Sequence, residues 1–281
     1  MKRLTLLTNP DICNLHCPLC FLNQRGVPAG YGEMPIEVAR RAVEKYHDVH
    51  ELIPSTMGEP LLYSYFNELL DICDESGIPM NLTTNGSFPG TWGSDAGMKR
   101  LLSACRDIKV STLSYEIGGL DELSWWRNVE KLLECRAGLQ IESASEKGQC
   151  VASVSLQVTL HRENFERAEQ LLRWAEQVGI DRIKWNPVVF LDCAPQELRN
   201  RFALPENVEG NLRGMLRSDT VRCEGSLFFG NRRGSCAVAE MDCDGNSPEC
   251  PFADEVWVWP DGHEDHCPNP KYRWTKYSCY I

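Results

Sequence analysis

Three cysteines within a stretch of eight residues constrain this chain more than any other feature. They are Cys13, Cys17 and Cys20, spaced C-x3-C-x2-C, and they follow a short apolar run at residues 4–7. Thiolates at this spacing can bind a compact soft metal centre. A [4Fe-4S] cluster with four protein ligands needs a fourth cysteine, which ferredoxin-type motifs supply close by, and residues 21–26 contain none. The spacing therefore predicts a cluster with three protein-bound irons and one open iron.

Two other interpretations of this triplet remain open. Zinc could bind the three cysteines together with His16, although adjacent ligands at positions 16 and 17 strain a four-point tetrahedral site. The three thiols could also be structural or redox cysteines without a metal. Motifs further along the chain favour the cluster.

The cysteine triplet resembles the signature of the radical S-adenosylmethionine (SAM) enzymes. This resemblance implies that the amino and carboxylate groups of SAM chelate the open iron. It also implies that an electron from the cluster splits SAM into methionine and a 5'-deoxyadenosyl radical, which takes a hydrogen atom from the substrate. An electron donor such as a flavodoxin or ferredoxin is implied as a partner.

Composition indicates the compartment and excludes some partners. Hydrophobic residues make up 42% of the 281, enough for a sizeable core, and no apolar run is long enough to span a membrane. The first residues do not form a secretory signal, and fourteen cysteines without one favour metal ligands and free thiols over disulfides. We therefore expect a cytoplasmic protein. The net charge of −11 argues against nucleic acid and anionic membranes as partners.

Strands alternate with amphipathic helices over residues 4–187. The predicted strands are 4–7, 51–55, 79–84, 108–113, 153–160 and 182–185. The predicted helices are 35–46, 62–73, 98–105, 122–136 and 163–177. Repeated β-α units indicate an α/β fold with a parallel, curled sheet and helices outside it. The resemblance implies that this is the partial (β/α)6 barrel of the radical SAM family, in a domain of residues 1–205.

Polar motifs follow the predicted strands, at the end of a parallel sheet where function is usually located. Residues 57–60, Met-Gly-Glu-Pro, resemble the family's Gly-Gly-Glu-Pro motif, with Met57 in place of the first glycine. The resemblance assigns Glu59 to the amino group of SAM, a role that suits a carboxylate. The small Gly58 would let the backbone approach the ligand closely. An ordinary turn acid is the alternative for Glu59.

Further SAM contacts are predicted beside the last cysteine of the triplet and at the ends of later strands. They are Leu19, Phe21, Thr84, Asn85, Ser111, Ser114 and Trp185. The apolar ones would pack on the adenine, and the polar ones resemble segments that reach the methionine or ribose of SAM. Turn formation is the alternative for the polar residues, and a place in the core is the alternative for Trp185.

The last 59 residues contain six cysteines and a short internal repeat. The cysteines are Cys223, Cys236, Cys243, Cys250, Cys267 and Cys279. Each copy of the repeat carries Asp-Gly-x4-Cys-Pro, beginning at Asp244 and Asp261, and predicts a β-hairpin. Residues 206–281 resemble the SPASM/twitch modules that hold an auxiliary [4Fe-4S] cluster. A twitch module with a single cluster is the better match, because only one cysteine follows Cys267.

The resemblance implies four ligands for this second cluster. Cys267 and Cys279 are two of them, and the other two come from the remaining four cysteines. A zinc knuckle formed by the same thiols stays open. Five other cysteines are isolated and are predicted to be small buried hydrophobes. They are Cys73, Cys105, Cys135, Cys150 and Cys193.

Residues 234–270 contain nine acidic side chains and no Lys or Arg. A solvated acidic face is one interpretation, and a rim that attracts a cationic small-molecule substrate is the other. The acidic cap and the run of residues 9–26 resemble radical SAM epimerases of aminoglycoside biosynthesis. That resemblance implies removal of a hydrogen from an amino-sugar carbon and its return to the opposite face by a thiol. We predict Cys250 as this donor, which leaves Cys236 and Cys243 as the partners of Cys267 and Cys279.

Three other functions remain open. The first is a dehydrogenase that oxidises an aminocyclitol or aminoglycoside hydroxyl and uses the auxiliary cluster as electron acceptor. The second is a peptide-modifying enzyme of the SPASM type. The third is a metal-binding scaffold without catalysis, against which the intact Glu59 motif argues.

Overall fold

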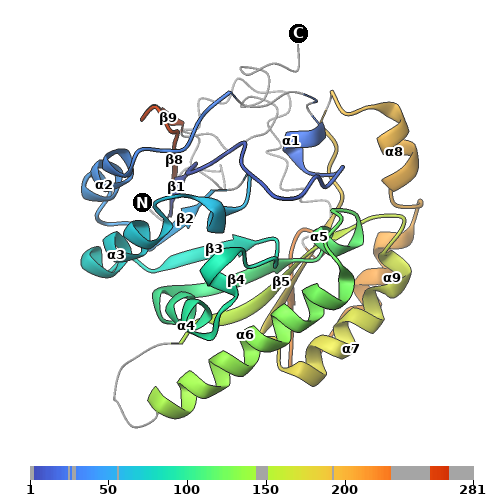
Figure 1. Ribbon diagram of the computed structural model, residues 1–281. Coiled ribbons are helices and arrows are strands. Elements are labelled where there is room, and N and C mark those ends of the chain that lie inside the picture. The colour runs from blue at the N-terminus through green and yellow to red at the C-terminus, as the bar shows by residue number, and fades with distance from the viewer. Residues whose placement is uncertain are drawn as a thin grey trace.

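A single, mostly parallel sheet organises the computed structural model (Figure 1), which describes residues 3–24, 26, 30–55, 57–143, 151–191, 193–228 and 254–265. Within those residues the strand order is β7-β6-β5-β4-β3-β2-β1-β8-β9. All neighbours are parallel except β8 and β9. The strands are β1 (Arg3–Leu6), β2 (Glu51–Pro54), β3 (Met80–Thr84), β4 (Cys105–Ser111), β5 (Ser153–Leu160), β6 (Arg182–Pro187), β7 (Arg222–Glu224), β8 (Glu255–Val258) and β9 (Glu264–Asp265).

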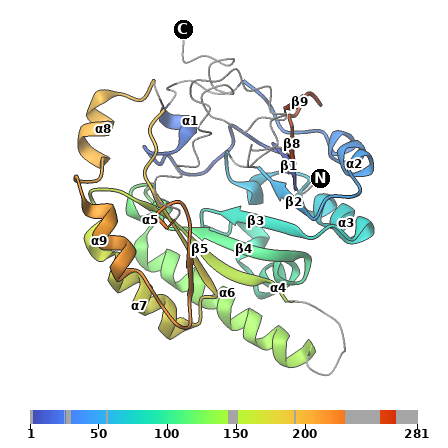
Figure 2. The same ribbon diagram turned by 180° about the vertical axis from the view of Figure 1, so that it is seen from behind.

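Helices cover the outer face of the curled sheet, as Figures 1 and 2 show from opposite sides. The helices of the described residues are α1 (Phe21–Gln24), α2 (Ile36–Lys45), α3 (Phe66–Ser76), α4 (Asp95–Ala104), α5 (Leu113–Glu116), α6 (Glu122–Ser143), α7 (Ala168–Val178), α8 (Gln196–Phe202) and α9 (Val208–Met215), of which α1 lies beyond the ends of the strands and not on the outer face. This arrangement confirms the predicted α/β fold with a parallel sheet and is consistent with a partial radical SAM barrel.

The alternation of residues along β5 explains the two faces of the sheet. Val154, Leu156 and Val158 are almost completely buried and belong to the core between the sheet and the helices. Ser155 and Gln157 alternate with them and therefore lie on the inner face. The same pattern on β4 and β6 gives the sheet one apolar face and one polar face.

Several predicted boundaries are wrong. β4 begins at Cys105 rather than 108 and ends at Ser111, because the chain turns there into the four-residue helix α5. A short 3-10 turn at Pro60–Leu62 (η1) delays α3 to Phe66, and α6 continues past 136 to Ser143. Helices α1, α8 and α9 and strand β7 were not predicted, since each is too short for a clear period.

Charged side chains fill the inner face near the amino ends of the strands. Asp107 on β4 lies 2.9 Å from Lys109 Nζ and accepts hydrogen bonds from Ser155 and Ser153 of β5 at 2.6 and 2.7 Å. Arg182 on β6 also pairs with Asp107. This network links three strands and leaves the carboxyl ends of the sheet to the predicted functional motifs.

The predicted hairpin at Asp261-Gly262 is present. β8 and β9 pair with Trp257 opposite Asp265, and Gly262 adopts a φ of +87° between them. β8 also pairs in parallel with β1, and Arg3 binds Glu51 at 2.6 Å and Glu255 at 2.8 Å. The hairpin therefore extends the barrel sheet. The division of the chain after residue 205 stays a prediction.

None of the helices in the described part of the chain is both long enough and apolar enough to cross a membrane.

Candidate functional site

The cysteine loop leaves β1 at the carboxyl ends of the strands and ends at α1. Its backbone is joined to the turn at residues 57–60, because the Glu59 amide donates to Ile12 O at 2.8 Å. The side chain of Asn9 donates in turn to Glu59 O at 2.7 Å. Met34 N donates to Thr8 O at 2.7 Å and anchors the start of the loop. These contacts fix the position of Glu59 relative to the cysteines.

The three thiols of the loop lie close enough to affect one another. Burial, together with the neighbouring Cys20 and Cys13, raises the pKa of the Cys17 thiol to about 12. Burial also raises the pKa of Cys13, and Glu59 and Cys20 add to the effect. Deprotonation of all three thiols is therefore unfavourable in the protein alone. A cationic centre bound to the thiolates would offset the free energy of deprotonation. This donor set fits a cluster.

Among the described residues, no three His, Cys, Asp or Glu side chains converge closely enough to hold a single metal ion. An iron-sulfur cluster distributes its thiolate ligands over several irons. Cys13, Cys17 and Cys20 therefore stay predicted cluster ligands.

Glu59 is a buried carboxylate with neutral partners only. Its side chain accepts hydrogen bonds from Thr84 Oγ1 at 2.7 Å, the Asn85 amide at 2.7 Å and the Leu61 amide at 3.2 Å. Burial raises the pKa of Glu59 to about 7, and these three donors reduce the rise without removing it. No cation among the described residues faces it. An ammonium group brought beside Glu59 would supply the missing charge.

Gly58 is required by the loop itself. Its φ is +83°, and a Cβ there would lie 2.3 Å from Asn9 O and 2.6 Å from Ile12 O. The close approach that calls for glycine is thus made by the backbone of the cysteine loop, and a contact of Gly58 with a ligand stays a prediction.

Met57 replaces the family's first glycine and has a structural use. It is 3% exposed and packs in a small apolar cluster with Leu7, Leu191 and Trp259. Phe21, predicted to lie on the adenine, packs against this same cluster. The cluster joins the cysteine loop to the residue that follows β8.

Asn85 links Glu59 to the first cysteine. Its side-chain Nδ2 lies 3.8 Å from Cys13 Sγ and donates to Asn14 Oδ1 at 2.9 Å, while its amide binds Glu59. The sequence predicted Thr84 and Asn85 as SAM contacts, and the structure brings Thr84 to Glu59 and Asn85 to both Glu59 and the cysteine loop.

The segment after β4 lies against Cys17. Cys17 Sγ is 3.8 Å from Leu113 O, and a Cβ on Gly118 would lie 2.4 Å from that sulfur. The Ser114 hydroxyl donates to Ser111 O at 2.8 Å and is almost fully buried. Both serines therefore shape this turn, and their predicted contact with ribose stays a prediction.

The two remaining apolar predictions lie in different surroundings. Leu19 is 5% exposed within the cysteine loop, and its carbonyl accepts from Gln24 Nε2 at 2.8 Å. Trp185 is fully buried in the core and stands opposite Val158, so it faces the helices and not the inner face of the sheet. Trp185 thus has the place in the core that was the alternative interpretation of this residue. A contact of Trp185 with adenine stays a prediction.

Two supporting residues were not predicted. Asn9 is fully buried and holds the Glu59 carbonyl, and Gln24 joins the loop to Leu191, whose amide donates to Gln24 Oε1 at 2.8 Å. The sequence contains one indication of a structural role for Asn9, because this polar residue directly follows an apolar run and precedes Pro10.

The remaining cysteines divide into three groups. Cys73, Cys105 and Cys135 are buried, which confirms their prediction as small hydrophobes. The same prediction is wrong for Cys193, which is only half-buried at the edge of the cluster around Met57. Cys223 is also half-buried and packs against the core from β7. The others lie outside the described residues: Cys150, Cys236, Cys243, Cys250, Cys267 and Cys279.

Comparison with known proteins identifies the family. Residues 10–199 match the radical SAM superfamily, and the chain belongs to it. The fold resembles that of SuiB from Streptococcus suis, with a TM-score of 0.66 at 16% identity over 95% of this chain and 60% of that one. It also resembles anSMEcpe with bound AdoMet and the Kp18Cys peptide, with a TM-score of 0.64 at 17% identity over 98% of this chain and 76% of that one.

Two curated relatives have different activities. A tungsten-containing aldehyde ferredoxin oxidoreductase cofactor-modifying protein of Pyrococcus furiosus is 23% identical over 60% of this chain and 47% of its own length. A 7,8-dihydro-6-hydroxymethylpterin dimethyltransferase of Methanocaldococcus jannaschii is 28% identical over 74% of this chain and 42% of its own length. This chain thus spans less than half of each of these relatives.

Proposed function

We propose that this chain is a radical SAM epimerase of an aminoglycoside, of the type that converts neomycin C to neomycin B. The observation that carries the SAM-cleaving part is the convergence of the cysteine loop, Glu59 and Asn85 at the carboxyl ends of the strands. The epimerase part rests on the sequence, through residues 9–26 and the acidic, cysteine-rich residues 234–270.

The described residues have distinct tasks in this proposal. Cys13, Cys17 and Cys20 would hold the cluster, and Glu59 would bind the amino group of SAM by charge and hydrogen bonding. Asn85 would fix the position of Glu59 relative to Cys13, because it contacts both. The cluster and SAM, when bound, supply a 5'-deoxyadenosyl radical that removes a hydrogen atom from the substrate.

The return of a hydrogen atom is assigned to Cys250. Its S–H bond breaks and a C–H bond forms on the opposite face of the sugar carbon, which leaves a sulfur radical on Cys250. One electron from a flavodoxin- or ferredoxin-type donor and one proton from solvent restore the thiol. A second electron from the same donor accounts for the cleavage of SAM. The sugar is neither oxidised nor reduced overall.

The test is a reaction in deuterated water. The full chain is reconstituted anaerobically with iron and sulfide and mixed with SAM, a reductant and neomycin C. Gain of one deuterium on carbon, with 5'-deoxyadenosine formed alongside, is the expected result. A product that has lost two hydrogens would contradict epimerisation and would indicate a dehydrogenase that uses the auxiliary cluster as electron acceptor. Gain of a methyl group would place the chain with its dimethyltransferase relative.

Cys250→Ala tests the donor separately from SAM cleavage. The variant is expected to form 5'-deoxyadenosine without the epimer, with the iron content of the auxiliary cluster unchanged. Loss of that iron would instead make Cys250 a ligand. Cys135→Ala is the matched control, since this thiol is buried on α6 and should affect neither readout.

A further inference from the structure

A pocket of about 310 Å³ lies outside the barrel, between the sheet and the helices α5, α6 and α7. Its floor includes Val158, Leu160 and Trp185, which belong to the helix side of β5 and β6. The pocket is therefore separate from the inner face of the sheet. Its size is at the lower end of the range for small-molecule sites in proteins.

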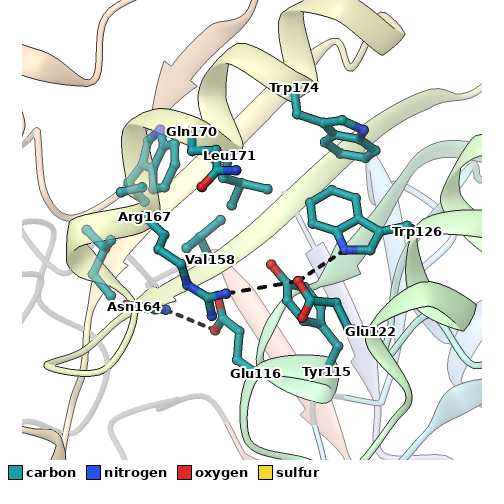
Figure 3. A pocket seen from close by; sticks show the side chains of 13 residues that line it. Tyr115, Glu116, Glu122, Trp126, Val158, Asn164, Arg167, Gln170, Leu171 and Trp174 are labelled. Carbon is teal, nitrogen blue, oxygen red and sulfur yellow. Dashed lines mark hydrogen bonds and ion pairs between the residues drawn. The ribbon is translucent and has the colours of Figure 1, made fainter.

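Aromatic rings form one wall of this pocket (Figure 3). Tyr115 comes from α5, Trp126 from α6 and Trp174 from α7. The rings of Trp126 and Trp174 pack edge to face with centroids 4.2 Å apart, and those of Tyr115 and Trp126 lie 5.5 Å apart. Such a wall presents π faces and ring edges to an apolar or cationic guest.

A buried carboxylate stands opposite the aromatic wall. The side chain of Glu116 is only 5% exposed, and its Oε2 accepts a hydrogen bond from Asn164 Nδ2 at 2.9 Å. Among the described residues, its second oxygen has no hydrogen-bond donor. This oxygen is absent from the fully buried, unpartnered atoms of the described residues, so part of its surface is accessible and it can accept a hydrogen bond from a ligand in the pocket.

Among the described residues, no cation forms an ion pair that cancels the charge of Glu116. His161 is fully buried with Nε2 3.5 Å from Glu116 Oε2, but its Nδ1 accepts a hydrogen bond from the Glu163 amide at 3.2 Å. An imidazole that accepts at Nδ1 is the neutral form with its hydrogen on Nε2. The pocket's arginine, Arg167, pairs instead with Glu122 at 4.0 Å, near the mouth.

We propose that this pocket binds a compact organic ammonium ion. The ammonium donates to the second oxygen of Glu116, and the carbon skeleton packs against Tyr115, Trp126 and Trp174. This inference goes beyond the proposed epimerase activity and does not depend on it, because the pocket contains none of the cysteines assigned to the cluster or to hydrogen return, and neither Glu59 nor Asn85. Of the predicted SAM contacts only Trp185 lines it, from the helix side of the sheet.

The test is a titration of the reconstituted full chain with cyclohexylamine, followed by tryptophan fluorescence and calorimetry. We expect saturable binding of the amine and no comparable binding of cyclohexanol or cyclohexanecarboxylate, which share its ring. Absence of saturable binding, or equal binding of the alcohol or the acid, would overturn the proposal.

Two variants locate the site. Glu116→Gln keeps an acceptor for Asn164 but removes the charge, and should weaken amine binding about tenfold or more. Glu122→Gln is the matched control; because Glu122 is half-exposed at the mouth, its removal should change affinity less than about threefold. Unchanged binding by Glu116→Gln contradicts the proposal.

Gln170→Trp provides a test that does not depend on the buried glutamate. Gln170 is exposed at the rim of the pocket, so a bulky side chain there can fill the mouth without disturbing the core. The variant should lose amine binding while its thermal unfolding stays that of the wild type. Retained binding would place the amine elsewhere and overturn the assignment.

Discussion

Two buried carboxylates at opposite ends of the sheet have opposite surroundings. Asp107, near the amino ends, and Glu59, at the carboxyl ends, are each 1% exposed. Burial by itself raises the pKa of both. Lys109 and the serine hydroxyls around Asp107 more than reverse that effect and lower its pKa. Glu59 has only neutral donors, and burial keeps its pKa at about 7.

The difference lies in where the compensating charge comes from. The chain itself supplies Lys109 and Arg182 to Asp107, so that network is complete without a ligand. Glu59 is well hydrogen-bonded but lacks a cation among the described residues. A buried acid with a raised pKa, at the end of the sheet where ligands bind, is typical of a functional site. The contrast supports the predicted role of Glu59 with the amino group of SAM.

Asp107→Asn should produce the largest change in stability. The substitution leaves the buried Lys109 without its acid, which typically costs about 3–5 kcal/mol, whereas the partly exposed Arg182 keeps Glu224 as a partner. Chemical denaturation of the reconstituted chain measures the free energy of unfolding. Asp95→Asn is the control, because Asp95 forms a surface pair with Lys131 at 2.9 Å and its loss should cost little. Similar losses in the two variants would show that the Asp107 network is not structural.

Glu59→Gln should affect ligand binding instead. Removing one partner of a buried charge pair weakens SAM binding by about 2 kcal/mol or more, or roughly 30-fold. Calorimetry with SAM measures this loss in the reconstituted chain. Glu68→Gln, an exposed acid on α3, is the control. A Glu59→Gln variant with wild-type affinity for SAM would remove the predicted role.

The fold was largely predictable because periodicity reports burial. β5 and α7 have strong alternation and helical spacing, and the predicted β5 has the bounds found in the structure. α5 was missed because four residues cannot show a period, although this helix places Tyr115 and Glu116 in the outer pocket. Short elements are positioned by tertiary contacts, and a sequence pattern contains little of that information.

The candidate site was predictable where a motif specifies chemistry. The cysteine spacing and Glu59 were found from the sequence, and the structure brings Glu59 and Asn85 to the loop. Met57 shows the limit, since its use in a cluster with Trp259 depends on a partner more than 200 residues away along the chain. Such long-range packing leaves no local signal.

The pH dependence of stability should separate the two acids. The pKa of Glu59 is raised from 4.5 to about 7, so its ionised form costs folding about 3 kcal/mol above pH 7. This cost disappears as the pH falls from about 7 to about 4.5, and the free energy of unfolding should rise over that range. Without SAM, the difference between wild type and Glu59→Gln should show this slope, and a flat difference would contradict the raised pKa.

Asp107 should behave in the opposite way. Its pKa is lowered in the folded chain, so its contribution is fully present above its unfolded pKa of about 3.9 and is lost as the pH falls through the folded value. Between pH 5 and pH 8, the difference between wild type and Asp107→Asn should therefore be flat. A slope in that interval would mean that Asp107 titrates like Glu59.

The smallest expected effect comes from removing one hydroxyl beside each acid. Ser155→Ala deletes a donor to Asp107 and should cost about 1–2 kcal/mol with the pKa of Asp107 still low, because Lys109 remains. Thr84→Val deletes a donor to Glu59, which keeps only backbone amides, so the pKa of Glu59 should rise further. The midpoint of the stability slope would then move to higher pH in Thr84→Val and stay unchanged in Ser155→Ala. An equal shift in both variants would mean that neutral donors, and not cations, distinguish the two sites.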